Sequence, residues 1–257
     1  MAFYHNINPI ILELGPLQIR WYGLMYVLSF LFVYWYAKKA AKENKIKLSE
    51  EQIDNIMLWL TIALIIGARL FDVLFWDFGY YSKNPIEILA IWQGGLSFHG
   101  GLLGIVITTY LLCKKYKIKF RNFADIFVVP LALAQAFGRI GNFINGELYG
   151  FPTKLPWGIN FANELDALGN PVFRHPSQLY EVMYNLIIFA VLWKLKDKKM
   201  PQGYLFAIFL VMYSLFRSIT EFIRVPDITF GQITMGHILN IPMFIIGITL
   251  LVKLKRK

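Results

Sequence analysis

Cysteine is almost absent from this sequence, and so are the short motifs that mark metal and nucleotide sites. A single cysteine, Cys113, stands among 257 residues, which excludes a disulfide within the chain. No HExxH or CxxC spacing occurs, so we predict no metal site. The sequence also lacks a P-loop, a GxGxxG following a strand and a serine-hydrolase elbow. We therefore expect no metal, no cofactor and no nucleotide.

Charge is scarce as well. Only 16% of the residues are charged, whereas 57% are hydrophobic, and the apolar runs are longer than a soluble core of this size would bury. The first 20 residues show no basic n-region and no small-residue cleavage site, so we expect the first apolar segment to be kept rather than removed. The composition predicts an all-α polytopic membrane protein.

Seven segments are apolar over the roughly 20 residues that a spanning helix needs. They are residues 18–37, 52–75, 94–113, 122–143, 177–195, 202–222 and 237–253. Of the 26 Lys and Arg, 18 gather in four patches, at 38–47, 114–121, 194–199 and 253–257, which follow the first, third, fifth and seventh segments. Because basic loops stay in the cytoplasm, this pattern predicts seven transmembrane helices, with the N-terminus outside and the C-terminus cytoplasmic.

The connections on the outer side have their own character. Residues 144–176, between the fourth and fifth spans, are rich in Gly, Pro and Asn, so we expect an extracytoplasmic cap with two or three short strands. The stretch "NPIEILAIWQ" at 84–93 suggests an interfacial helix on the outer membrane surface. We expect no separate soluble domain, so residues 1–257 form one transmembrane domain with the cap as an insertion.

Several ionisable or hydroxyl-bearing side chains are predicted at one depth in the membrane. A charge at mid-bilayer costs about 2.5–3.5 kcal/mol on insertion scales, which makes each one a functional candidate. Counted from the outer ends of the predicted spans, all lie within about 9 Å of the interface at the helical rise per residue. The members of this predicted polar layer are Tyr22, Arg69, His99, Arg139, Glu181, Arg217 and Glu221.

Some members have a simpler structural explanation. Arg69 and Asp72 stand three residues apart on one helix face and are expected to pair with each other. Tyr22 is typical of an aromatic-belt residue at the interface. Arg217 and Glu221 are four apart in the less favourable Arg-first order, so a local ion pair explains them less well and favours a functional role.

The histidines divide in a similar way. His99 lies in "GLSFHGGLLG", where the glycines allow close approach of a backbone or a ligand, although small-residue helix packing would explain them too. His5 falls in an N-terminal tail that we expect to be mobile, and His237 lies near the outer end of the last span. Asp125, near the cytoplasmic end of the fourth span, is interpreted as a helix-start residue.

The segment "GRIGNFINGELYG" at 138–150 resembles the signature of the bacterial prolipoprotein diacylglyceryl transferases. "SFHGGLLG", "RHPSQLYE" and "FRSITEFIRVPD" resemble further motifs of that family, and the similarity runs from "IRWYGLMY" to the last span. The resemblance implies transfer of the diacylglyceryl group of phosphatidylglycerol to the lipobox cysteine thiol of a preprolipoprotein, with release of glycerol 1-phosphate. It also implies seven spans with an outer cap.

The polar layer suits that reaction. Both substrates place their reacting groups at the outer headgroup boundary, so we expect an inner-membrane protein whose active site faces the outer leaflet. Arg139 and Arg217 would stabilise the departing phosphate, and His99 would take the thiol proton. The residues expected to orient the arginines and the lipid, or to leave room for them, are Tyr22, Asn142, Gly146, Glu147, Gly150 and Glu221.

Two other functions remain open from the residues alone. An anion transporter or channel could line its path with Arg69, Arg139 and Arg217, but transporters place their sites near the midplane, and these charges stop at the outer third. A lipid-modifying enzyme with another acceptor would need the same polar layer. Cys113 is predicted at the cytoplasmic end of its span, so a lipid intermediate on this thiol is disfavoured and direct displacement is the simpler scheme.

Overall fold

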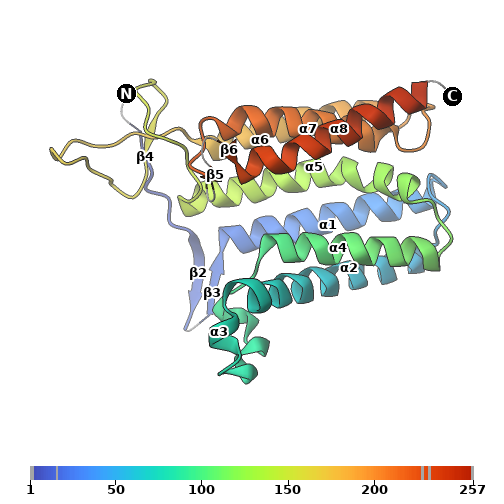
Figure 1. Ribbon diagram of the computed structural model, residues 1–257, viewed down its shortest axis with the longest axis horizontal. Coiled ribbons are helices and arrows are strands. Elements are labelled where there is room, and N and C mark those ends of the chain that lie inside the picture. The colour runs from blue at the N-terminus through green and yellow to red at the C-terminus, as the bar shows by residue number, and fades with distance from the viewer. Residues whose placement is uncertain (1–2, 16, 227–228, 231–232, 256–257) are drawn as a thin grey trace. The chain divides into compact units, whose positions relative to one another are not determined.

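The computed structural model describes residues 3–15, 17–226, 229–230 and 233–255. Seven long helices dominate the described residues, and each overlaps one of the predicted apolar segments (Figure 1). They are α1 (Trp21–Lys42), α2 (Glu50–Phe71), α4 (Phe98–Lys115), α5 (Phe120–Asn145), α6 (Ser177–Leu195), α7 (Tyr204–Glu221) and α8 (Met235–Lys255). The all-α prediction is confirmed.

Four stretches within the described residues are long and apolar enough to cross a membrane. They are Glu50–Trp76, which joins α2 to the π-helical turn η1 (Asp72–Trp76), then Phe120–Asn145, Tyr204–Glu221 and Met235–Lys255. Their outward faces carry exposed Leu, Ile and Phe side chains, as a helix surrounded by lipid requires. The chain is therefore a polytopic membrane protein.

The chain divides into two compact units. The larger unit comprises residues 1–36 and 124–257, and the smaller unit comprises residues 37–123. The smaller unit is built on α2 and α4, which approach closely because glycines line the contact. A Cβ placed on Gly104 would overlap the carbonyl of Ala63, and one on Gly100 would overlap the carbonyl of Gly67. Small residues thus let two membrane helices pack backbone to backbone.

Arg69, which we expected to pair with Asp72, attracts that carboxylate but directs its hydrogen bonds to other partners. The residue is 4% exposed, and its guanidinium donates to five backbone carbonyls of the loop after α3 (Phe78–Tyr81). The shortest of these bonds are 2.6 Å from Nη2 to Glu87 O and 2.7 Å from Nη1 to Gly94 O. The full set of acceptors is Glu87, Ile88, Ala90, Gly94 and Gly95. Arg69 therefore fixes this loop.

The predicted interfacial helix over 84–93 is wrong. The segment instead forms two short 3₁₀ turns, η2 (Pro85–Leu89) and η3 (Ile91–Gln93). Ala90, with φ −81° and ψ 60°, lies outside the helical region and separates the two turns. Arg69 donates to the carbonyls of Glu87 and Ile88 in this irregular segment. Ile86, Leu89 and Trp92 nevertheless stay at least 71% exposed, so the segment keeps an outward apolar surface.

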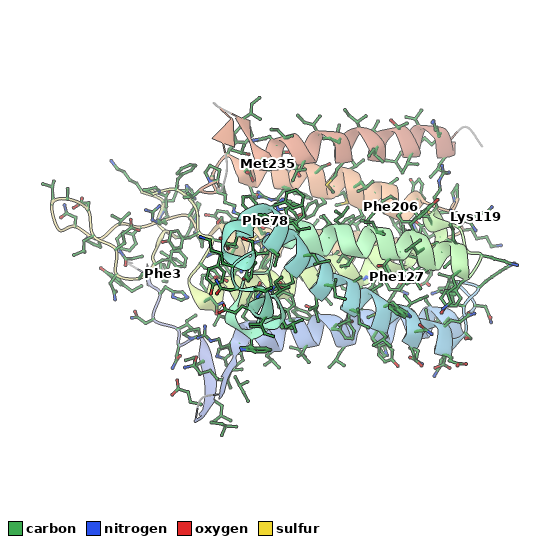
Figure 2. The ribbon with its side chains drawn as sticks, turned by 60° about the horizontal axis from the view of Figure 1, so that its bottom comes forward. Phe3, Phe78, Lys119, Phe127, Phe206 and Met235 are labelled. Atoms are coloured by element: carbon green, nitrogen blue, oxygen red, sulfur yellow. The ribbon has the colours of Figure 1, made fainter. Side chains whose placement is uncertain are left out.

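In the larger unit α7 packs against both α6 and α8. The end of α7 meets the start of α8, so these two helices run antiparallel, with Phe206 and Met235 at opposite ends of the pair (Figures 1 and 2). Asp125 on α5 accepts hydrogen bonds from the amides of Gly203 and Phe206 at 2.5 and 2.8 Å. It therefore caps the N-terminus of α7 rather than that of its own helix, because four amides at a helix start lack partners within the helix.

Residues 146–176 contain no helix, and their β-structure is limited to β4 (Ile159–Asn160) and isolated bridges. β4 pairs in parallel with β1 (Phe3–Tyr4), so Phe3 and Tyr4 lie against the predicted cap (Figure 1). His5 donates its backbone amide to Asn160 O at 2.9 Å and its ring packs on Phe161. The expectation of a mobile tail is wrong for these residues.

Two further hairpin pairings complete the described strands. β2 (Ile10–Leu14) pairs antiparallel with β3 (Leu17–Arg20) directly before α1, and β5 (Thr229–Phe230) pairs with β6 (Ile233–Thr234) directly before α8. The second hairpin matters for the site because it delivers Thr234 to the end of α7.

Candidate functional site

The signature segment 138–150 forms the last turns of α5 and a tight turn after it. Helix α5 ends at Asn145, and Gly146 follows with φ +68°, a left-handed conformation that glycine adopts without strain. Room is also limited there, since a Cβ on Gly146 would lie 3.2 Å from Cε1 of His5. The ring of His5 is held in that place by a 2.7 Å hydrogen bond between its Nε2 and Phe143 O.

Arg139 is the centre of the first polar cluster. Its Nε lies 2.6 Å from Oε2 of Glu181 on α6, a carboxylate whose side chain is only 1% exposed. Its Nη1 donates to Oδ1 of Asn142 at 3.2 Å, and Nδ2 of Asn142 donates in turn to Oε1 of Glu147 at 2.8 Å. The side-chain amide of Asn142 is thus fixed at both its oxygen and its nitrogen, and it links Glu147 to the guanidinium of Arg139 by hydrogen bonds.

Arg217 is the centre of the second cluster. It forms an ion pair with Glu221 one turn later on α7, and the side chains of both residues are buried, at 12% and 4% exposure. Glu221 also accepts a 2.7 Å hydrogen bond from the hydroxyl of Thr234. Glu181 lies near enough to Arg217 to attract its charge, so this one buried carboxylate acts on both arginines.

A third set of contacts holds the backbone of the signature turn. Nε2 of Gln178 donates to Glu147 O at 2.6 Å, and the hydroxyl of Ser177 donates to Leu148 O at 2.9 Å. Both donors begin α6, the helix that also carries Glu181. The motif "RHPSQLYE" therefore fixes the turn with its first helical residues and Arg139 with its last residue.

Gly150 is confined by its neighbours. Its amide donates to His175 O at 2.8 Å, and an added Cβ would overlap the carbonyl of Ile223 and press on His175. Only glycine fits where the signature turn passes between the start of α6 and the end of α7.

Tyr22 lies against the signature helix from α1. A Cβ on Gly141 would meet its ring at 2.7 Å, so the glycine of the signature is what lets the tyrosine approach α5. The hydroxyl of Tyr22 is 3.0 Å from that of Tyr26.

His99 belongs to the smaller unit. It is the second residue of α4, and its side chain is exposed in that unit, with its ring 5.9 Å from the ring of Phe98. Its role as a base stays a prediction. In the larger unit the structure brings together seven of the predicted residues, namely Arg139, Asn142, Gly146, Glu147, Gly150, Arg217 and Glu221, with Tyr22 on the adjoining face of α5.

Four contributors, Glu181, Ser177, Gln178 and His5, were assigned no role by sequence reasoning. Glu181 was recognised only as a member of the polar layer, and Ser177 and Gln178 were quoted only as part of a motif. The available signal was their spacing, because Ser177, Gln178 and Glu181 share one helix face at positions i, i+1 and i+4. His5 offered no such signal, since its position depends on the pairing of β1 with β4.

The arrangement is suited to binding an anion. Each guanidinium forms an ion pair with a buried carboxylate, which holds the guanidinium plane in one orientation. Each ion pair has almost no net charge. Nη2 of Arg139 has no acceptor among the residues that the structure describes, so one fork of the guanidinium is available for a further oxygen. No group of three or more His, Cys, Asp or Glu that could hold a metal ion occurs in the same residues.

Comparison with known proteins adds independent findings. A family model described as prolipoprotein diacylglyceryl transferase matches residues 9–253. A phosphatidylglycerol–prolipoprotein diacylglyceryl transferase of Nitratidesulfovibrio vulgaris (strain DP4) is 42% identical, over 98% of this chain and 96% of the relative. Enzymes of the same name from Geobacter sulfurreducens and Coxiella burnetii (strain RSA 331 / Henzerling II) are 40% and 41% identical, the former over 100% of this chain and 98% of the relative, the latter over 96% and 95%.

Proposed function

The chain belongs to the prolipoprotein diacylglyceryl transferase family, and from this premise we propose that it transfers the diacylglyceryl group of phosphatidylglycerol to the lipobox cysteine of a preprolipoprotein. The reaction forms a thioether and releases glycerol 1-phosphate, which is the first step of bacterial lipoprotein maturation. The observation that carries the proposal for this chain is the pair of arginines, each set by a buried carboxylate around the family's signature turn.

The chemistry requires stabilisation of a leaving phosphate. The thiolate attacks the glycerol carbon, the carbon–oxygen bond breaks, and the electron pair leaves on a phosphate monoester. Negative charge therefore grows on the phosphate oxygens in the transition state, where fixed cations are most effective. We assign Arg139 and Arg217 to this task, and their ion pairs with Glu181 and Glu221 would hold them ready before the lipid arrives.

The attacking thiol must first lose its proton. A thiol with a pKa of about 8.5 is only slightly ionised at neutral pH, so a base positioned beside it increases the rate of thiolate attack. We assign that base to His99, because histidine is the side-chain type best suited to accept a proton near neutral pH. The substrate cysteine displaces the phosphate directly, because Cys113 belongs to the cytoplasmic end of α4 in the proposed topology.

The remaining residues orient the lipid and the arginines. Asn142 and Glu147 extend the hydrogen-bonded chain from Arg139, and Glu221 does the same for Arg217. Gly146 and Gly150 do not leave room for the lipid as the sequence predicted, because His5 fills the space beside Gly146 and the Ile223 carbonyl and His175 fill the space beside Gly150. We assign them to the close packing of the signature turn. Tyr22 lines the neighbouring face of α5 and would contact the donor.

We further propose seven spans in the bacterial inner membrane, with the N-terminus and the 144–176 cap outside and the active site toward the outer leaflet. Four basic patches support this orientation. Single cysteines near Lys45 and Lys198 should resist an impermeant thiol reagent in intact cells, whereas one near Asn163 should react. Labelling of the Lys198 position from outside would refute the seven-span topology.

The function itself is tested with purified protein in lipid vesicles. The protein is incubated with phosphatidylglycerol and a peptide that carries a lipobox cysteine, and the peptide is analysed by mass spectrometry. We expect a mass increase equal to one diacylglyceryl group, and an Arg139→Ala variant as control should give almost none. A peptide of unchanged mass after prolonged incubation with the unaltered protein would refute the transfer.

A further inference from the structure

The Glu221 carboxylate is enclosed by the first residues of α8. Gly236 lies so close that a Cβ there would overlap the carboxylate, and Thr234 donates its hydroxyl to Oε1 at 2.7 Å. His237 follows on the same turn, and its Nδ1 is 3.0 Å from the Thr234 hydroxyl oxygen. A continuous chain of contacts therefore runs from Arg217 through Glu221 and Thr234 to His237.

The hydrogen-bond capacity of Thr234 determines which nitrogen of His237 carries the proton. A hydroxyl has one proton to donate and two lone pairs that accept. The proton goes to Glu221, because an ionised carboxylate only accepts. Both lone pairs are then engaged by His237, one by its backbone amide at 3.3 Å and one by Nδ1. Nδ1 must therefore carry hydrogen, and in the neutral ring Nε2 is left as an acceptor.

That acceptor is buried and unused. Nε2 of His237 is shielded from solvent and has no hydrogen-bond partner among the described residues. The ring of His237 also contacts the ring of Phe222, with a centroid distance of 4.9 Å. A buried acceptor without a donor is unfavourable, so a ligand that supplies an O–H or S–H group would satisfy it.

We propose that Nε2 of His237 accepts a hydrogen bond from a free hydroxyl of the glycerol headgroup of phosphatidylglycerol. The inference rests on the proposed function and extends it to the choice of phospholipid donor. The headgroup glycerol is esterified to the phosphate, so its hydroxyls lie beside the arginine that binds that phosphate. The attacking thiol, by contrast, approaches the carbon from the side opposite the leaving phosphate, away from the Arg217 to His237 chain.

The test compares two phospholipid donors, one with the free headgroup hydroxyls and one without them. One is phosphatidylglycerol, and the other carries an n-propanol headgroup, which keeps the phosphate ester and the bond that breaks. The ratio of kcat/KM for the two donors is measured for the unaltered protein, for His237→Phe and for His237→Gln. Phe keeps a planar ring without an acceptor, whereas Gln keeps an acceptor and a donor and serves as the matched control. His237→Leu provides a second apolar side chain if the Phe variant does not accumulate in the membrane.

The unaltered protein should prefer phosphatidylglycerol, and His237→Phe should lose about three- to tenfold of that preference, as expected for one neutral hydrogen bond. His237→Gln should retain most of it. An unchanged ratio in His237→Phe overturns the assignment, even if both rates fall, because a fall in both rates indicates packing or a contact with the thiol. A protein that forms no thioether from phosphatidylglycerol at all would instead refute the proposed function, so the two failures are distinguishable.

Discussion

Removal of the Arg139 charge separates its structural role from its chemical one. In Arg139→Gln the carboxylate of Glu181, at 1% exposure, loses a counter-ion at 2.6 Å. Breaking a buried ion pair costs about 3–5 kcal/mol, and we expect the lower end because 23% of the Arg139 side chain is exposed and Arg217 still attracts Glu181. The variant should therefore unfold at a clearly lower temperature than the unaltered protein.

The double variant Arg139→Gln/Glu181→Gln removes both charges. A neutral pair leaves no uncompensated charge, so the free energy of unfolding should return to within about 1 kcal/mol of the unaltered value. Activity should not return with it. Loss of a donor that acts mainly on the transition state lowers turnover by roughly 10²–10³, and this deficit should persist in the double variant.

The two quantities are measured on the same preparation in lipid nanodiscs, as the thermal unfolding midpoint and as the initial rate of thioether formation. Glu181→Gln alone is the control, since it keeps the guanidinium but frees it from its anchor. A double variant that regains both stability and near-normal turnover would refute the reasoning. Arg139 would then serve only to neutralise Glu181.

Three further predictions concern other parts of the chain. Asp125→Ala removes the cap on the α7 amides and should cost about 1 kcal/mol of unfolding free energy at nearly unchanged activity, measured by thermal unfolding; a large loss of turnover in a stable variant would contradict a purely structural role. The Arg174 guanidinium lowers the pKa of Glu164, so their ion pair should stabilise the cap fully above the unfolded Glu pKa of about 4.3. This stabilisation should be lost as the pH falls through the lower folded pKa. In Glu164→Gln the stability of the cap should depend less on pH in that range, and an acid transition equal to that of the unaltered protein would argue against the pair. His99→Gln should lose most activity at neutral pH and regain much of it as the pH passes the thiol pKa of about 8.5, whereas a deficit independent of pH would remove His99 from the catalytic residues.

The helices were predictable from the sequence because the signal is local. Runs of about 20 apolar residues specify a membrane helix without reference to the rest of the chain. The signature segment could also be recognised as a candidate site from the sequence, because an arginine and two asparagines in an apolar run require polar partners. The contacts between α6 and the signature turn were not predictable, because they depend on how two separate helices dock.

The errors have a common physical origin. The apolar pattern at 84–93 predicted a helix, but the segment forms two 3₁₀ turns, and Arg69 of α2 donates to their carbonyls. Arg69 was expected to pair with Asp72, and it attracts that carboxylate, but it donates its hydrogen bonds to backbone carbonyls of a separate loop. His5 looked like part of a free tail because a two-residue parallel pairing leaves no pattern in the sequence. Each case involves long-range hydrogen bonds that the local sequence pattern does not show.

The central claim is that the arginine pair expels a phosphate by cleavage of a carbon–oxygen bond, and the fate of one oxygen atom tests it most directly. Phosphatidylglycerol is prepared with a heavy oxygen isotope in the ester oxygen between the diacylglyceryl carbon and phosphorus, and the products are weighed by mass spectrometry. The account predicts that the heavy oxygen leaves with glycerol phosphate while the peptide gains an unlabelled diacylglyceryl thioether. Heavy oxygen retained in diacylglycerol, with unlabelled glycerol phosphate released, would mean phosphorus–oxygen cleavage and would contradict it.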